Sequence, residues 1–115
     1  MRQIADLLLG SGSEGIAALI SVVNEFVDPA APPSPEQFAS IRQALADGGE
    51  GTYYAEAREW LNTLVQYVLI LQEEFGWSAD ESIAFVIDKY GPSPSDPANA
   101  ALLAFLQMQL AGVSI

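Results

Sequence analysis

Residues 53–75 read YYAEAREWLNTLVQYVLILQEEF, and this stretch decides the fold because it is the longest helical pattern in the chain. Its apolar side chains recur at alternating intervals of four and three residues, which is the spacing of one helix face. A second column, of aromatic side chains, runs beside that face. A helix over the whole range would be about 35 Å long and would serve as the spine of the fold. The apolar column consists of Ala57, Leu61, Leu64, Val68, Leu71 and Phe75, and the aromatic column of Tyr53, Trp60 and Tyr67.

Shorter helical patterns lie on both sides of this stretch. Residues 14–27 and 35–47 precede it, and residues 79–90 and 98–110 follow it. Residues 2–9 form a further short apolar pattern that ends at a glycine. Strand-like alternation of useful length is absent from the sequence. We therefore predict an all-α fold: a compact single-domain bundle of about five helices plus a short N-terminal helix, spanning residues 1–115.

The residues at the ends of these patterns are typical of helix termini. Ser34 and Gln37 have the spacing of a capping box, in which each side chain bonds the backbone N–H of the other residue, and so do Ser78 and Glu81. Gly76 directly follows the spine and is a good C-terminal stop. These signals place the helix boundaries independently of the apolar patterns.

Composition and charge exclude several classes of function. The 115 residues carry a formal net charge of -11, from 15 acidic and only 4 basic residues. Such a surface repels nucleic acid and anionic lipid, so we expect neither nucleic acid nor membrane as a partner. The chain has no cysteine and no histidine, which removes the usual nucleophile–base pairs of hydrolases and the strongest ligands for zinc. For this reason we expect a non-enzymatic protein. Asp6 interrupts the N-terminal apolar run, so we expect no signal peptide and a cytoplasmic location.

The stretch ADGGEG at residues 46–51 is the one candidate metal site. Asp47 and Glu50 supply hard oxygen donors, and Glu56 follows one turn into the next helix. This arrangement predicts, as one alternative, a divalent-cation (calcium) site outside the EF-hand family. An EF-hand is excluded because the twelfth position counted from Asp47 is Arg58, where a bidentate glutamate is required.

The other interpretation of the same stretch needs no ligand. Gly48 and Gly49 would end one helix with a residue of positive φ, and Thr52 would cap the next helix. No cofactor other than calcium is expected from the sequence.

The last helix is a candidate contact surface. After Asp96 the chain carries no charged side chain. So apolar a helix must be covered, either by the protein's own core, which we favour, or by another subunit. In the second case its leucines would form the interface; they are Leu102, Leu103, Leu106 and Leu110.

Aromatic residues of the spine are the other candidate surface. Tyr54 lies off the main column and near the glycine loop, so we expect it to be exposed, while Trp60 belongs to the aromatic column. The leading hypothesis is a non-enzymatic acidic helical protein that acts through protein–protein contact, with a partner protein or as a homodimer. The alternative hypothesis is calcium binding at residues 47–56.

Overall fold

The computed structural model describes residues 12–28, 31 and 33–112 of the chain. Within these ranges the chain forms only helices, with turns and loops between them. The prediction of an all-α single-domain bundle is therefore confirmed, and the short helix predicted over residues 2–9 lies outside the described residues. The helices are α2 (Gly12–Phe26), α3 (Pro35–Asp47), α4 (Tyr53–Phe75), α5 (Ala79–Tyr90) and α6 (Pro97–Leu110).

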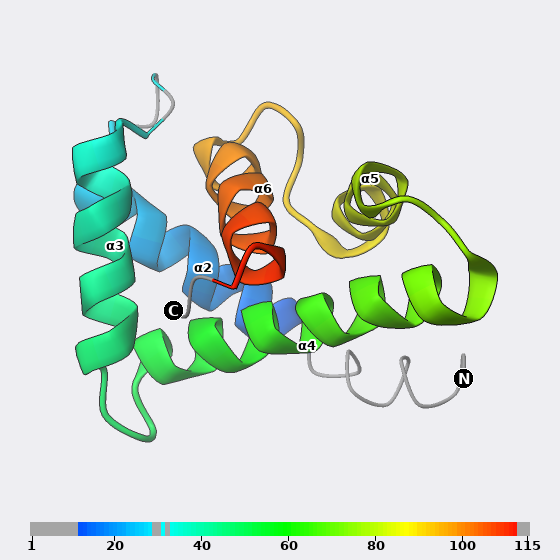
Figure 1. Cartoon of the computed structure of the whole chain (residues 1–115). Helices are drawn as coiled ribbons and strands as arrows, with labels where there is room; N and C mark the ends of the chain where they lie inside the picture. The colour runs from blue at the N-terminus through cyan, green and yellow to red at the C-terminus, as the bar shows by residue number, and fades with distance from the viewer. Residues whose placement is uncertain (1–11, 29–30, 32, 113–115) are drawn as a thin grey trace.

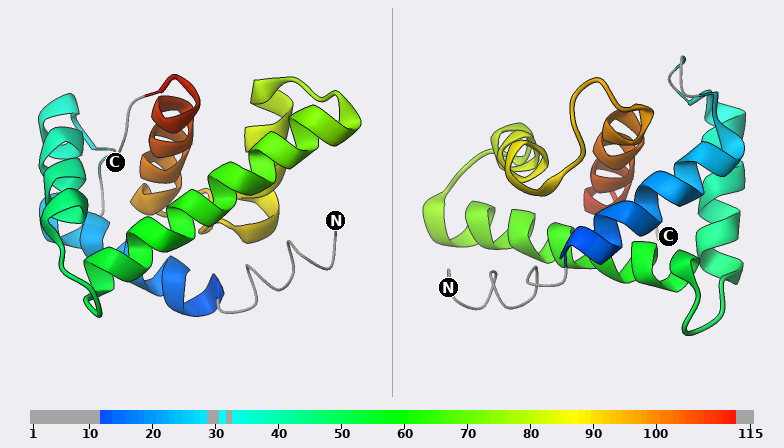
Figure 2. Two further views of the ribbon diagram at one scale, coloured as in Figure 1. Left: turned by 60° about the horizontal axis from the view of Figure 1, so that its bottom comes forward. Right: turned by 180° about the vertical axis from the view of Figure 1, so that it is seen from behind.

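The spine α4 contacts each of the other described helices. Its most extensive contact is with α2, which crosses it, while α3 stands beside its N-terminal end and α5 lies along its C-terminal half (Figure 1). The views from below and from behind in Figure 2 show α6 held in the middle, between α3 and α5. None of the helices in the described part of the chain is both long enough and apolar enough to cross a membrane.

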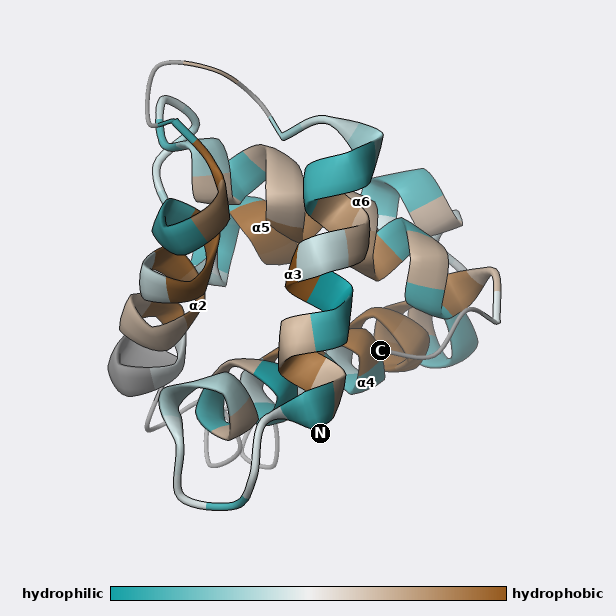
Figure 3. Ribbon diagram, turned by 90° about the vertical axis from the view of Figure 1, so that its left-hand side faces the viewer, coloured by the Kyte–Doolittle hydropathy of each residue, from teal (hydrophilic) through white to brown (hydrophobic). Residues whose placement is uncertain are grey.

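The core lies where α2, α4 and α6 meet. Figure 3 shows α2 with its hydrophobic residues turned toward the interior of the bundle and its hydrophilic residues outward. Burial of these side chains is the main source of stability, at roughly 25 cal/mol per Å² of apolar surface removed from water. The largest fully buried side chains are Leu19, Val22, Val23, Ile41, Leu45, Leu61, Leu64, Val68, Val86, Leu102, Phe105 and Leu106.

Capping explains the helix boundaries, with one difference from the prediction. The Ser34 hydroxyl accepts from the Gln37 backbone N–H at 3.2 Å, and the Gln37 side chain accepts from the Ser34 N–H at 2.6 Å, which confirms that capping box. The Ser78 hydroxyl likewise accepts from the Glu81 N–H at 3.1 Å. The Glu81 carboxylate, however, accepts from the Ser78 hydroxyl at 3.3 Å instead of bonding the Ser78 backbone. The second capping box therefore forms only in part. The Ser78 hydroxyl accepts from the Glu81 N–H, as in a capping box, but the Glu81 carboxylate bonds that hydroxyl and not the Ser78 backbone N–H.

The loop between α3 and α4 differs from the prediction in where its positive φ lies. Gly48, which follows α3, has a φ of -63°, and the residue with positive φ is Gly51, at 79°. Gly48 is required for space instead: a Cβ there would lie 2.5 Å from the Cβ of Tyr54. Thr52 caps α4 as predicted, with its side chain accepting from the Ala55 N–H at 3.2 Å.

Candidate functional site

The predicted metal ligands lie at the N-terminal end of α4. Asp47 is the last residue of α3, and its carboxylate accepts from the Gln43 side-chain amide at 2.8 Å. Glu50 is exposed in the loop, and Glu56 is exposed in the first turn of α4, where the helix dipole favours a negative charge. Across the described ranges, the structure gathers no group of three or more acidic side chains that could hold a metal ion. It therefore does not bring Asp47, Glu50 and Glu56 together.

The leucines of the predicted α6 interface divide into two groups. Leu102 and Leu106 are fully buried in the core, whereas Leu103 is 39% exposed and Leu110 is half-buried. Trp60, another predicted interface residue, is also buried, because it packs against α2 at Gly15. In the folded chain Leu102, Leu106 and Trp60 are thus not available to a partner. The chain's own core covers α6, as we favoured.

Tyr53 and Tyr54 join α4 to α2. Their rings stack with centroids 4.2 Å apart, and both hydroxyls donate to the carboxylate of Glu25 near the end of α2. The hydrogen bond to Glu25 raises the pKa of Tyr54, and burial and the negative charge of Glu25 act in the same direction. The expectation that Tyr54 is the exposed tyrosine was wrong: Tyr54 is half-buried and Tyr53 is 36% exposed, because Tyr54 packs over Gly48.

A row of aromatic rings lies at the opposite end of α4, and we call it the aromatic seam. Phe75 and Trp77 have ring centroids 6.4 Å apart, and Trp77 meets the edge of Phe85 at 5.3 Å. Phe85 lies 6.4 Å from Tyr67, which in turn meets Tyr90 at 5.4 Å. All of these separations fall within the range of favourable aromatic pairs. The seam is therefore one continuous row of rings built from α4, the turn after it and α5.

A left-handed glycine creates the turn in the seam. Gly76 has a φ of 70°, and its N–H bonds the carbonyl of Gln72 at 3.1 Å. The next N–H, of Trp77, reaches the Leu71 carbonyl at 3.4 Å. The chain thus folds back over the last turn of α4, and the indole of Trp77 is placed against Phe85.

Phe75 is the exposed end of the seam. Sequence spacing placed it in the apolar column of α4, one turn after Leu71, yet it is 61% exposed while Leu71 is buried. Among the helices that the structure describes, α4 extends past α6, and α5 is the one that lies alongside its last turn (Figure 1). The remaining rings of the seam are half-buried.

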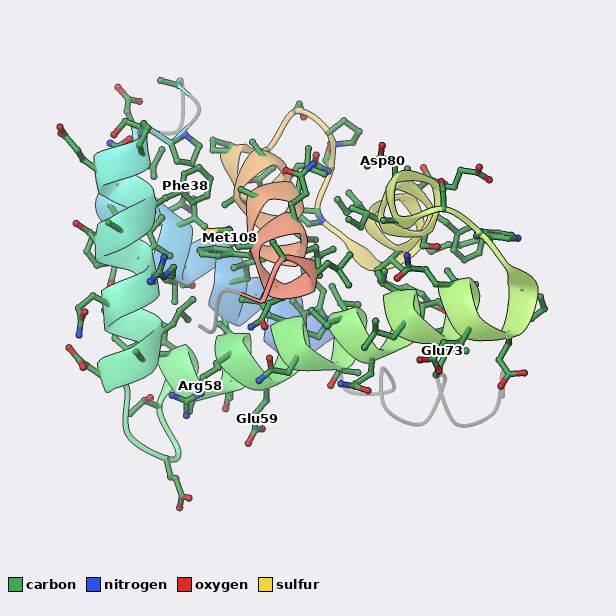
Figure 4. All side chains as sticks on the ribbon, viewed as in Figure 1. Phe38, Arg58, Glu59, Glu73, Asp80 and Met108 are labelled. Atoms are coloured by element: carbon green, nitrogen blue, oxygen red, sulfur yellow. The ribbon has the colours of Figure 1, made fainter. Side chains whose placement is uncertain are left out.

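Acidic side chains lie on the outer sides of the two helices that carry the seam. Glu73 and Glu74 are exposed in the last turn of α4, and Asp80 and Glu81 are exposed in the first turn of α5. In Figure 4, Glu73 points away from α5 and Asp80 points away from α4, so acids lie on both outer sides of this helix pair. Lys89 on α5 supplies a cation, and its ammonium lies 5.8 Å from the centroid of the Phe85 ring.

Sequence reasoning missed most of the seam. Phe85 lies off the apolar face of residues 79–90, and that position was the available sign of a surface aromatic. No local signal could have shown that Phe75 is uncovered, because its exposure depends on where α6 ends in space. Comparison of the chain with protein-family models, with curated proteins and with solved structures found no match.

Proposed function

We propose that this protein acts by binding another protein, without catalysis, and that the aromatic seam is the contact surface. The observation that carries the proposal is Phe75, a large apolar side chain that is 61% exposed at the end of a row of half-buried rings. Aromatic side chains are enriched in the energetically dominant centres of protein interfaces. Covering Phe75 and the adjoining face of Trp77 would remove apolar surface from water at a small ordering cost to the backbone, because the N–H groups of Gly76 and Trp77 already bond the last turn of α4.

The other exposed apolar groups fit a contact surface less well. In the part of the chain that the structure describes, the exposed large hydrophobic residues are Tyr53, Phe75 and Leu103. Tyr53 is held by its bond to Glu25, and Leu103 is 39% exposed on α6. A single exposed leucine is common on protein surfaces. Phe75 is joined through Trp77 to the other rings of the aromatic seam.

Electrostatics favours a different protein over a second copy. Each chain carries a formal net charge of -11, so two copies that meet through the acidic ends of α4 and α5 would repel each other. Leu102 and Leu106, which would otherwise supply an apolar dimer interface, are buried. We therefore propose that the partner is a different protein and that the seam does not form a homodimer.

A site-specific photocrosslink tests the proposal. Phe75 is replaced by photo-reactive benzoylphenylalanine in the protein's own cells, with Glu59, exposed on the other half of α4, as the matched control position (Figure 4). We expect one discrete adduct, heavier than the chain and different from a dimer, from position 75 and not from position 59. The absence of such an adduct, or the same adduct from both positions, would refute the proposal, and an adduct of dimer mass would show self-association instead.

A further inference from the structure

We infer, on the basis of the proposed function, that the partner presents a cationic amphipathic segment, with lysine or arginine side chains beside aliphatic ones, to the aromatic seam. The structure already contains an example of this contact. The Lys89 ammonium lies 5.8 Å from the centroid of the Phe85 ring, within the range in which a cation is attracted to an aromatic face. Phe85, one ring of the seam, thus has a face that a cation already approaches.

The acidic residues on the two helices that carry the seam also favour a cationic partner. Between positions 73 and 90 the sequence holds five acidic residues and one basic residue. Aliphatic or aromatic side chains of a partner would cover Phe75 and Trp77, while its cations would meet the acids on the outer sides of α4 and α5. An acidic segment, nucleic acid or an anionic membrane would be repelled by the same acids.

The negative charges of Glu73 and Glu74 do not stabilise α4. Negative charges in the last turn of a helix oppose the helix dipole, which favours cations at that end. In the described part of the chain, neither carboxylate forms a hydrogen bond or ion pair. Asp80 and Glu81 are different, because the first turn of α5 stabilises them. A cationic partner gives Glu73 and Glu74 a role that the isolated helix does not.

Two synthetic peptides provide the first test. Both form an amphipathic helix with leucine on one face, and the polar face carries lysine in one peptide and glutamate in the other. Binding is followed by tryptophan fluorescence, and a Trp77→Phe variant shows which part of the signal comes from the seam, because Trp60 is buried. We expect the lysine peptide to bind at least about tenfold more tightly than the glutamate peptide at low salt, and to weaken as salt is added.

A pair of double variants separates a local effect from the effect of net charge. Glu73→Gln with Glu74→Gln removes two charges from the last turn of α4, next to Phe75. Glu50→Gln with Glu59→Gln removes two exposed charges from the loop before α4 and from its N-terminal half. We expect the first pair to weaken binding of the lysine peptide about fivefold and the second pair to change it less than about twofold. Phe75→Ser should weaken binding to a similar extent as the first pair, without unfolding the chain, because its side chain is mostly exposed.

The outcomes distinguish this inference from the proposed function. Equal binding of the two peptides, no salt dependence, or equal effects of the two double variants would overturn the inference that the partner is cationic. A specific crosslink at position 75 would still support the proposed protein contact in each of those cases, with an acidic or neutral partner. If the crosslink fails while the lysine peptide binds as expected, the surface has the inferred chemistry but the proposed protein contact is wrong.

Discussion

At the scale of single residues, Gly76 is the position on which the aromatic seam depends. Its φ of 70° lies in the left-handed region, where a side chain is strained, although a Cβ there would meet no atom within 4 Å. We expect Gly76→Ala to lower the free energy of unfolding by about 1 kcal/mol, measured by urea denaturation. Gly49→Ala is the matched control, since that position is equally open and has no positive φ. Equal losses in the two variants would contradict this explanation.

Glu25 is the residue that ties α2 to both tyrosines of α4. The hydrogen bond that Tyr54 donates to Glu25 raises the pKa of the tyrosine. The folded protein therefore holds this proton more tightly than the unfolded chain. The stabilisation is complete below the ordinary tyrosine pKa of about 10 and is lost as the pH rises through the raised value.

This coupling predicts a change in the titration of Tyr54. We expect Glu25→Gln to lower the pKa of Tyr54, because an amide neither attracts the phenol proton as a carboxylate does nor repels the phenolate. The measurement is the alkaline rise of phenolate absorbance, with Tyr54→Phe identifying the contribution of Tyr54. An unchanged titration curve in Glu25→Gln would show that the hydrogen bond does not form in solution.

At the scale of helices, the crossing of α2 and α4 is set by a close approach between Gly15 and Trp60. A Cβ at Gly15 would lie 2.4 Å from Cγ of Trp60, far inside contact distance. An alanine in a helix is ordinarily better than glycine by about 1 kcal/mol, so helix propensity and packing here predict opposite signs. Packing prevails because the added Cβ would also lie 2.5 Å from Cβ of Trp60, an atom close to the backbone of α4, and because the indole is buried in the core.

We therefore expect Gly15→Ala to destabilise the protein by about 2 kcal/mol, measured by thermal or urea denaturation. The effect should shrink or reverse when Trp60→Leu is introduced first, because the smaller side chain leaves space for the added methyl group. A stabilising Gly15→Ala in the otherwise unchanged protein would show that the two helices do not approach so closely.

At the scale of the whole molecule, the neighbours of α6 decide which of its leucines belong to the core. Leu106 is fully buried and Leu103 is 39% exposed, although the two lie one turn apart on the same uncharged helix. We expect Leu106→Ala to lower the free energy of unfolding by about 3 kcal/mol. Leu103→Ala should lower it by less than about 1 kcal/mol. Comparable losses in the two variants, measured by urea denaturation, would mean that another chain or a different packing covers Leu103.

The sequence by itself determined which of the described stretches are helical and, for α3, α4 and α5, where the helices end. The predicted helix over residues 53–75 has the same bounds as α4, and Ser34, Thr52 and Ser78 cap the helices that they were predicted to cap. These predictions succeed because a cap or a helical face is defined by residues within one or two turns of each other. Such short-range interactions can be recognised from the order of residues alone.

Only the tertiary structure decided which side chains a partner can reach. Phe75 and Leu71 lie in the same column of α4. Leu71 is buried, but α4 extends beyond α6 and Phe75 is exposed. Leu102 and Leu106 are buried by helices far away in the sequence, and Glu25 meets Tyr53 and Tyr54 from another helix. Exposure depends on the lengths and crossing of packed helices, which are set by contacts between distant parts of the chain. The candidate surface therefore could not be predicted from sequence patterns, because these patterns describe only residues within a few positions of each other.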